Sequence, residues 1–286
     1  MRKISVIISL ILVIVMTYNT VNAFSRATIT LGNVDQVDEL AILNHNGIYF
    51  VQWSNDSSSF VVADANGLWL RETNIPAAIP RELSGHARTS SSLVISPDNT
   101  ILASGQYDKV VRLYHYQTST EYAVLEGHSA NINQIAFSAD SSLLVTASDD
   151  HTAMVWDVVR GEQLSILSGH QDSVTGVAFS RNGDLIVSGS TDGTVRLWHS
   201  VNGKAEAALE GHTAPVTSVT FNRDGSLLAS ASEDGTILLW DVNSHKIVKV
   251  LANHSGGITY LQFSPDGTLL LSASDDNTLR MWGIGI

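Results

Sequence analysis

Cysteine is absent from this chain of 286 residues. Its absence excludes disulfide scaffolds, thiolate nucleophiles and zinc sites built on thiolates. Proline is scarce, with 5 residues against 21 glycines, and that ratio suits a fold of many short strands and tight turns. The chain is 44% hydrophobic and 15% charged, which excludes a disordered protein.

Basic residues are also few. The sequence has 16 lysines and arginines against 28 acids, for a net charge of −12, and shows no basic stripe. Because a nucleic acid is a polyanion, this balance excludes it as a partner.

The first 23 residues have the pattern of a secretory signal peptide. Arg2 and Lys3 precede an apolar run over residues 4–16, and the small-residue spacing that ends at Ala23 is typical of a cleavage site. We therefore expect a secreted, periplasmic or lumenal protein. The alternative is an uncleaved membrane anchor formed by residues 4–16, the one case in which a membrane would be a partner. Thirteen apolar residues span roughly 20 Å of helix, short of a ~30 Å hydrocarbon core.

The rest of the chain repeats one unit. Histidines 86, 128, 170, 212 and 254 are 42 residues apart, and four of them follow a glycine. His45, 41 residues before His86, begins a weaker copy. Six copies therefore occupy residues 38–286, after a lead-in over residues 24–37.

Each copy predicts four short strands joined by turns. In the copy that begins at His170, the strands are expected at 174–179, 185–188, 194–198 and 205–209, with Asn and Gly in the turns. No stretch after residue 23 has an apolar period of 3.6 residues, so we expect almost no helix.

These motifs resemble the WD-repeat family of β-propellers. The residues that carry the likeness are the Gly-His pairs, the sequence Phe-Ser-Pro-Asp-Gly over 263–267, and the Trp-Asp pairs at 156–157 and 240–241. The resemblance covers nearly all of the chain after residue 23. It implies an all-β fold of four-stranded antiparallel blades packed around an axis.

The end of the chain indicates how such a ring closes. The last copy stops after its third strand, around Trp282, and residues 39–43 have a fourth-strand pattern with no sheet before them. We therefore expect six blades closed by the N-terminal strand. The alternative is a seven-bladed ring with one incomplete blade.

Four polar residues recur at fixed offsets from each histidine. A Ser-His-Asp triad is rejected, because a nucleophile site does not occur four times at one spacing. The resemblance implies a structural tetrad instead, in which Trp donates to Ser, Ser to His and His to Asp. The sets are His128, Ser148, Asp150, Trp156; His170, Ser190, Asp192, Trp198; His212, Ser232, Asp234, Trp240; and His254, Ser274, Asp276, Trp282.

The first two copies are irregular. In the second copy, Gln106 replaces the serine and Tyr114 the tryptophan. Either these copies have drifted, or they carry a binding surface. By resemblance, partners usually bind the narrower face of the ring around its central channel, where the residues just after each histidine and just before each turn aspartate lie. The candidate partner-binding residues there are Ile48, Phe50, Tyr107, Asp149, Glu233 and Asp275.

We predict no catalytic residue, metal ligand or cofactor. The remaining histidines, His115, His151, His199 and His245, are expected to be scattered and not to converge. The function expected is a non-enzymatic scaffold for a protein or peptide; the alternative is an enzyme or a small-ligand or glycan binder with a site in the central funnel. No feature indicates a homo-oligomer. Asn55 and Asn253 fit the N-glycosylation pattern, with Asn253 expected to be buried and Asn55 favoured.

Overall fold

The computed structural model describes residues 50–54, 59–64, 67–72, 81–83, 90–106, 108–264 and 267–283. In these residues the chain forms strands and turns without any helix, as the periodicity predicts. The described part accordingly has no helix that could cross a membrane. The predicted signal peptide and the lead-in lie outside the described residues. Contacts divide the chain into two compact units, residues 1–82 and 83–286.

Strands pair in chain order within six sheets. The first sheet holds β1 (Phe50–Trp53), β2 (Ser59–Asp64), β3 (Gly67–Glu72) and β4 (Arg81–Leu83). The second holds β5 (Ser90–Ile95), β6 (Ile101–Gln106), β7 (Val111–His115) and β8 (Thr120–Leu125). The third holds β9 (Ile132–Phe137), β10 (Leu143–Ser148), β11 (Thr152–Asp157) and β12 (Glu162–Ser168). The fourth holds β13 (Val174–Phe179), β14 (Leu185–Ser190), β15 (Val195–His199) and β16 (Ala205–Leu209). The fifth holds β17 (Val216–Phe221), β18 (Leu227–Ser232), β19 (Ile237–Asp241) and β20 (Lys246–Leu251). The sixth has three strands, β21 (Ile258–Phe263), β22 (Leu269–Ser274) and β23 (Leu279–Gly283).

The tight turn between the second and third strands requires a left-handed backbone. Gly193 and Gly235 follow the turn aspartates of the fourth and fifth sheets, each with φ +80°. His151 and Asn277 occupy the same place in the third and sixth sheets, with φ +69° and +62°. Glycine adopts this conformation without strain, whereas a histidine does not.

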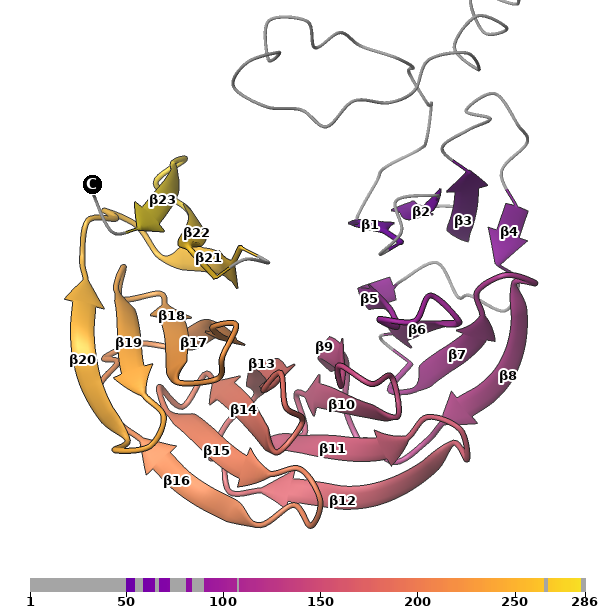
Figure 1. Ribbon diagram of the computed structural model, residues 1–286, viewed down its shortest axis with the longest axis horizontal. Helices are drawn as coiled ribbons and strands as arrows, with labels where there is room; N and C mark the ends of the chain where they lie inside the picture. The colour runs from indigo at the N-terminus through magenta and orange to yellow at the C-terminus, as the bar shows by residue number, and fades with distance from the viewer. Residues whose placement is uncertain are drawn as a thin grey trace, which may run out of the picture. The chain divides into compact units, whose positions relative to one another are not determined.

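The core of the second unit consists of apolar layers between successive sheets. One cluster joins the second and third sheets, and three more join the third to the fourth, the fourth to the fifth and the fifth to the sixth. Figure 1 shows these five sheets arranged as a fan, with β5, β9, β13, β17 and β21 inside and β8, β12, β16 and β20 outside. Since each strand alternates its side chains, one sheet contributes to the layers on both of its faces.

The sixth sheet departs from this arrangement. Leu279 and Met281 on β23 are 65% and 68% exposed, whereas Val195 and Leu197, at the same positions of β15, are fully buried. The sixth sheet has three strands among the described residues, as expected for a last copy that stops after its third strand. The segment expected to supply its fourth strand, residues 39–43, lies outside the described residues.

Candidate functional site

In the four regular sheets, the third to the sixth, the histidine side chains are buried and engage the turn aspartates. His170 Nδ1 lies 3.1 Å from Asp192 Oδ2, and the same pair of atoms is 2.8–3.0 Å apart in the other three regular sheets. A carboxylate only accepts hydrogen bonds, so Nδ1 carries the proton and Nε2 is left to accept one. Burial lowers the pKa of His170 and of His212, and this favours the neutral ring.

The hydroxyl that completes each tetrad lies two residues earlier than predicted. Trp198 Nε1 donates to Ser188 Oγ at 2.8 Å, and Ser188 Oγ lies 2.8 Å from His170 Nε2. The corresponding hydroxyls of the third, fifth and sixth sheets belong to Thr146, Ser230 and Ser272. Placing Ser148, Ser190, Ser232 and Ser274 in the tetrads is therefore wrong.

Strand register explains this correction. Trp198 lies opposite Ile186 in the β14–β15 pair, so Ser188 is its diagonal neighbour and Ser190 lies two residues further away. Ser190 holds the turn instead: its hydroxyl donates to the Asp172 carbonyl and accepts the N–H of Asp192. A sequence signal for the correct position exists, because a hydroxyl residue stands 18 after every histidine from 86 to 254.

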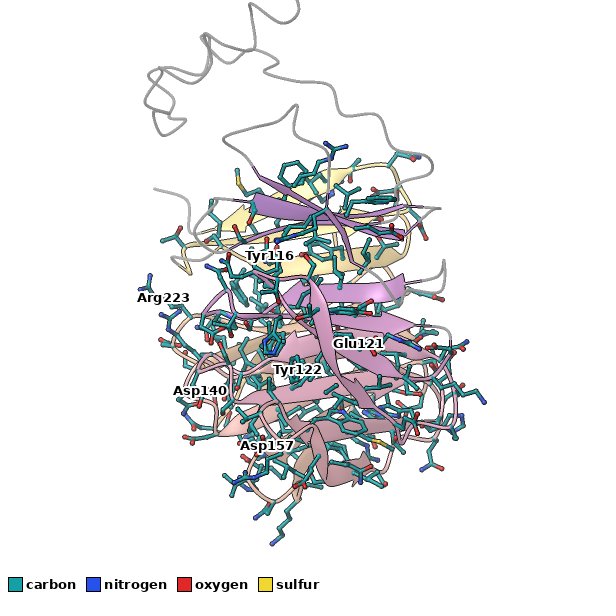
Figure 2. All side chains as sticks on the ribbon, turned by 90° about the vertical axis from the view of Figure 1, so that its right-hand side faces the viewer. Tyr116, Glu121, Tyr122, Asp140, Asp157 and Arg223 are labelled. Atoms are coloured by element: carbon teal, nitrogen blue, oxygen red, sulfur yellow. The ribbon has the colours of Figure 1, made fainter. Side chains whose placement is uncertain are left out.

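In the second sheet, the residue in the place of the tryptophan makes a different set of polar contacts. Tyr114, in the place of the tryptophan, is fully buried, and its hydroxyl donates to Glu121 Oε2 at 3.3 Å. Arg112 forms ion pairs with two carboxylates. Its Nε lies 3.4 Å from Glu121 Oε2, and its Nη1 lies 2.8 Å from Asp108 Oδ2. Figure 2 labels Glu121 and its neighbour Tyr122, whose hydroxyl donates to the Val158 carbonyl of the third sheet. This irregular sheet therefore contains its own set of paired polar groups.

The candidate partner-binding residues of the second unit share one edge of the sheets. The N–H groups of Asp149, Glu233 and Asp275 donate to carbonyls of residues that lie three after the histidines. Glu233 and Asp275 are exposed. Ile48 and Tyr107 lie outside the described residues, as does the side chain of Phe50, whose backbone is in β1.

Asp149 has a structural role that the sequence did not reveal. Its carboxylate accepts hydrogen bonds from Asn131 and Asn133 of the third sheet and from Ser173, which leads into the fourth. Burial raises the pKa of Asp149, but these hydrogen bonds outweigh that effect and hold the pKa below its ordinary value. The Asp149 carboxylate therefore ties two sheets together.

Two of the remaining histidines converge, contrary to the prediction. His199 Nε2 lies 3.6 Å and His245 Nε2 3.2 Å from the two oxygens of Glu206, across the fourth and fifth sheets. His115 stacks on Tyr122, and His151 lies 3.9 Å from Asp172. Even so, no group of His, Asp and Glu within the described ranges is arranged to hold a metal ion.

Asn253 is also placed differently from the prediction. It is exposed, not buried, while the next residue, His254, is buried. Asn55 lies outside the described residues.

Comparison with known families agrees with this architecture. The family model described as "WD domain, G-beta repeat" matches residues 78–115, 119–157, 161–199, 203–241 and 245–283, well over half of the chain. No curated protein matches the chain. The five matches confirm the resemblance that the repeated histidines, aspartates and tryptophans indicate, and the chain belongs to the WD40 family.

Proposed function

We propose that this protein is an exported, non-enzymatic scaffold that binds a protein or peptide partner. WD40 domains generally bind protein partners, and the chain contains five matched repeats. Export is supported by the charged start, apolar run and Ala23 cleavage pattern of residues 1–23. The intact mass of the purified protein tests this part: an N-terminus at Phe24 supports cleavage, whereas an N-terminus at Met1 supports the anchor.

The observation that carries the binding proposal is a pair of exposed acids on neighbouring sheets. A Cβ atom placed on Gly257 would lie 3.2 Å from Glu233 Cα and 3.5 Å from Asp275 Oδ2, so the two acids flank this glycine. Glu233 and Asp275 lie at the same edge of the sheets as Asp149. The Asp149 carboxylate already accepts hydrogen bonds from Asn133 and Ser173. An acidic edge in a chain with 28 acids and 16 bases favours a basic segment of a partner.

A lysine-rich peptide tests this edge, with a glycine-serine peptide of equal length as the uncharged control. Binding of the lysine peptide should weaken about tenfold in the double variant Glu233→Gln/Asp275→Asn and at raised salt. Asp184→Asn, an exposed change in the turn between β13 and β14, serves as the control variant. Equal binding by the wild type and the double variant would refute the placement.

A closed ring of six sheets belongs to the same proposal. It is supported by the exposed Leu279 and Met281 of β23 and by the fourth-strand pattern of residues 39–43. If this segment pairs with β23 as β16 pairs with β15, Ala41 lies opposite Arg280. In a chain without cysteine, the pair Ala41→Cys/Arg280→Cys should then form a disulfide under mild oxidation. Failure to form this disulfide would argue against closure in that register.

A further inference from the structure

The outer strand of the third sheet, β12, has a free edge. It lies at the outside of the fan in Figure 1, and among the described residues it pairs with β11 alone. With seven residues, it is also the longest strand in the described part of the chain. The backbone N–H and C=O groups on the outer side of such a strand have no ladder partner, so they can pair with another strand.

The edge of β12 lacks the charges that protect its counterparts. Of the four outer strands described in the second unit, β8, β16 and β20 carry Glu121, Glu206 and Lys249 within the strand. In contrast, β12 is uncharged after its first residue, Glu162. Charged side chains on an edge strand oppose pairing with another sheet, and β12 does without them over most of its length.

Large apolar side chains are exposed along this strand. Leu164 and Ile166, two residues apart on β12, are about half exposed. Both positions therefore keep apolar surface in water that a neighbouring strand would cover.

Two further exposed side chains lie beside β12. Val159, in the turn that leads into this strand, is 84% exposed, and Val201, in the corresponding turn of the fourth sheet, is 89% exposed. A Cβ atom on Gly203 would lie 2.8 Å from Ser165 Cβ, so the turn of Val201 packs against β12. Single exposed apolar residues are ordinary, but a group of them marks an interaction surface.

The residue pattern of β12 matches a second copy of the same strand. In an antiparallel pair centred on Ser165, each Leu164 lies opposite Ile166 of the other copy, and each Glu162 lies opposite Ser168. The apolar side chains then form two cross-strand pairs, and the two glutamates stay apart. A strongly acidic or basic segment would find no opposite charge on β12 after Glu162, whereas an uncharged strand needs none.

We propose that the protein forms a two-fold dimer in which the β12 strands of two copies pair antiparallel and join their third sheets into one. Two-fold symmetry requires the same patch on both copies, as this pairing provides. Backbone hydrogen bonds hold the strands, and Leu164 and Ile166 leave water. Because only one strand per copy takes part, the contact is small and the Kd should be on the order of 10 µM. None of these residues belongs to the acidic edge of Glu233, so the dimer does not depend on the binding proposed there.

Sedimentation equilibrium of the full chain, from about 1 to 300 µM, measures the dimer on both sides of its expected Kd. The mass should rise from one chain toward two. Ile166→Lys places a charge in the pair and should leave a monomer at all these concentrations. Val250→Lys is the matched control, because Val250 is also about half exposed and holds the same register position on β20. A monomeric wild type, an undiminished dimer in Ile166→Lys, or loss of the dimer in Val250→Lys would overturn the proposal.

Salt distinguishes this contact from an association of opposite charges. Each copy has a net charge of −12, so two copies repel, while the paired strands contribute few charges of their own. Raising the salt from about 0.05 to 0.5 M screens the repulsion and should tighten the dimer several-fold. A dimer that weakens at high salt would contradict an uncharged contact.

Cysteine substitution tests the register of the pair. In this chain without cysteine, the double variant Glu162→Cys/Ser168→Cys should form a disulfide-linked dimer under mild oxidation. Each single variant is a control that should stay unlinked, because equal positions of the two copies would lie about 20 Å apart along the pair. Absence of the linked dimer in the double variant, or equal linking in a single variant, would overturn the antiparallel pairing.

Discussion

Ser188 accepts the indole N–H of Trp198 at 2.8 Å, and the same hydroxyl lies 2.8 Å from His170 Nε2. Ser188 is fully buried, so neither neighbour has water as a substitute partner. The hydroxyl thus connects the third strand of the fourth sheet to the histidine that precedes its first strand. Its equivalents repeat this connection in the third, fifth and sixth sheets.

Ser188→Ala is expected to lower the free energy of unfolding by about 1–3 kcal/mol, because it leaves two buried groups without a partner. Ser188→Thr should retain most of the stability, since Thr146 makes the same contacts in the third sheet. Urea denaturation of the two variants measures the difference. If alanine and threonine proved equal, the hydroxyl would not be what holds the tetrad.

Trp198→Phe is expected to destabilise the protein by about 1–3 kcal/mol, because the Ser188 hydroxyl then no longer accepts a hydrogen bond from the indole N–H. Trp282→Phe is the matched variant: its indole makes the same bond at 2.9 Å, but the side chain is only half-buried and should cost less. Thermal unfolding compares the two. A melting temperature that does not change in Trp198→Phe would contradict the network.

Stability should fall as the pH falls, in two steps. Burial lowers the pKa of His170, so below pH ~6.5 the unfolded chain takes up a proton that the folded chain does not. Burial raises the pKa of Asp192, but hydrogen bonds from Thr194 and the N–H of Gln171 outweigh it and lower the pKa to about 2. This contribution to stability is present above pH ~3.9 and is lost as the pH approaches 2.

Urea denaturation at pH 8, 6, 4 and 2.5 measures both steps. Between pH 4 and 2.5, the Asp192→Asn variant should lose less stability than the wild type. Between pH 8 and 6, the His170→Gln variant should lose less stability than the wild type. Greater stability at pH 6 than at pH 8 would show the opposite sign for the histidines, and thus protonated rings in the folded state.

His151→Gly is expected to stabilise the protein by about 0.5–1 kcal/mol. The residue has φ +69° at a position where the fourth and fifth sheets have glycine, and the relief of backbone strain exceeds the entropy that glycine loses on folding. The exposed side chain makes only a 3.9 Å approach to Asp172, so little is lost with it. His151→Ala, which keeps the strain but removes the ring, is the control, and equal stability of the two variants would contradict the argument.

Which residues recur was readable from the sequence, but which of them touch was not. The 42-residue spacing of the histidines predicts the four-strand unit, and five family matches confirm it. The unbroken recurrence of a hydroxyl 18 residues after each histidine favours Ser188 over Ser190. The contact itself is established only by the register of β14 against β15, because both residues point to the same face of one strand.

Contacts between residues that are distant in the sequence likewise depend on the tertiary structure. His199 and His245 are 46 positions apart and meet at Glu206 only because the fourth and fifth sheets pack side by side. The Nε of Arg196 is buried without a hydrogen-bond partner among the described residues, and nothing in the sequence around Arg196 indicates this. Local alternation and turn residues determine each sheet from the sequence alone, whereas packing between sheets selects the partner of each polar group.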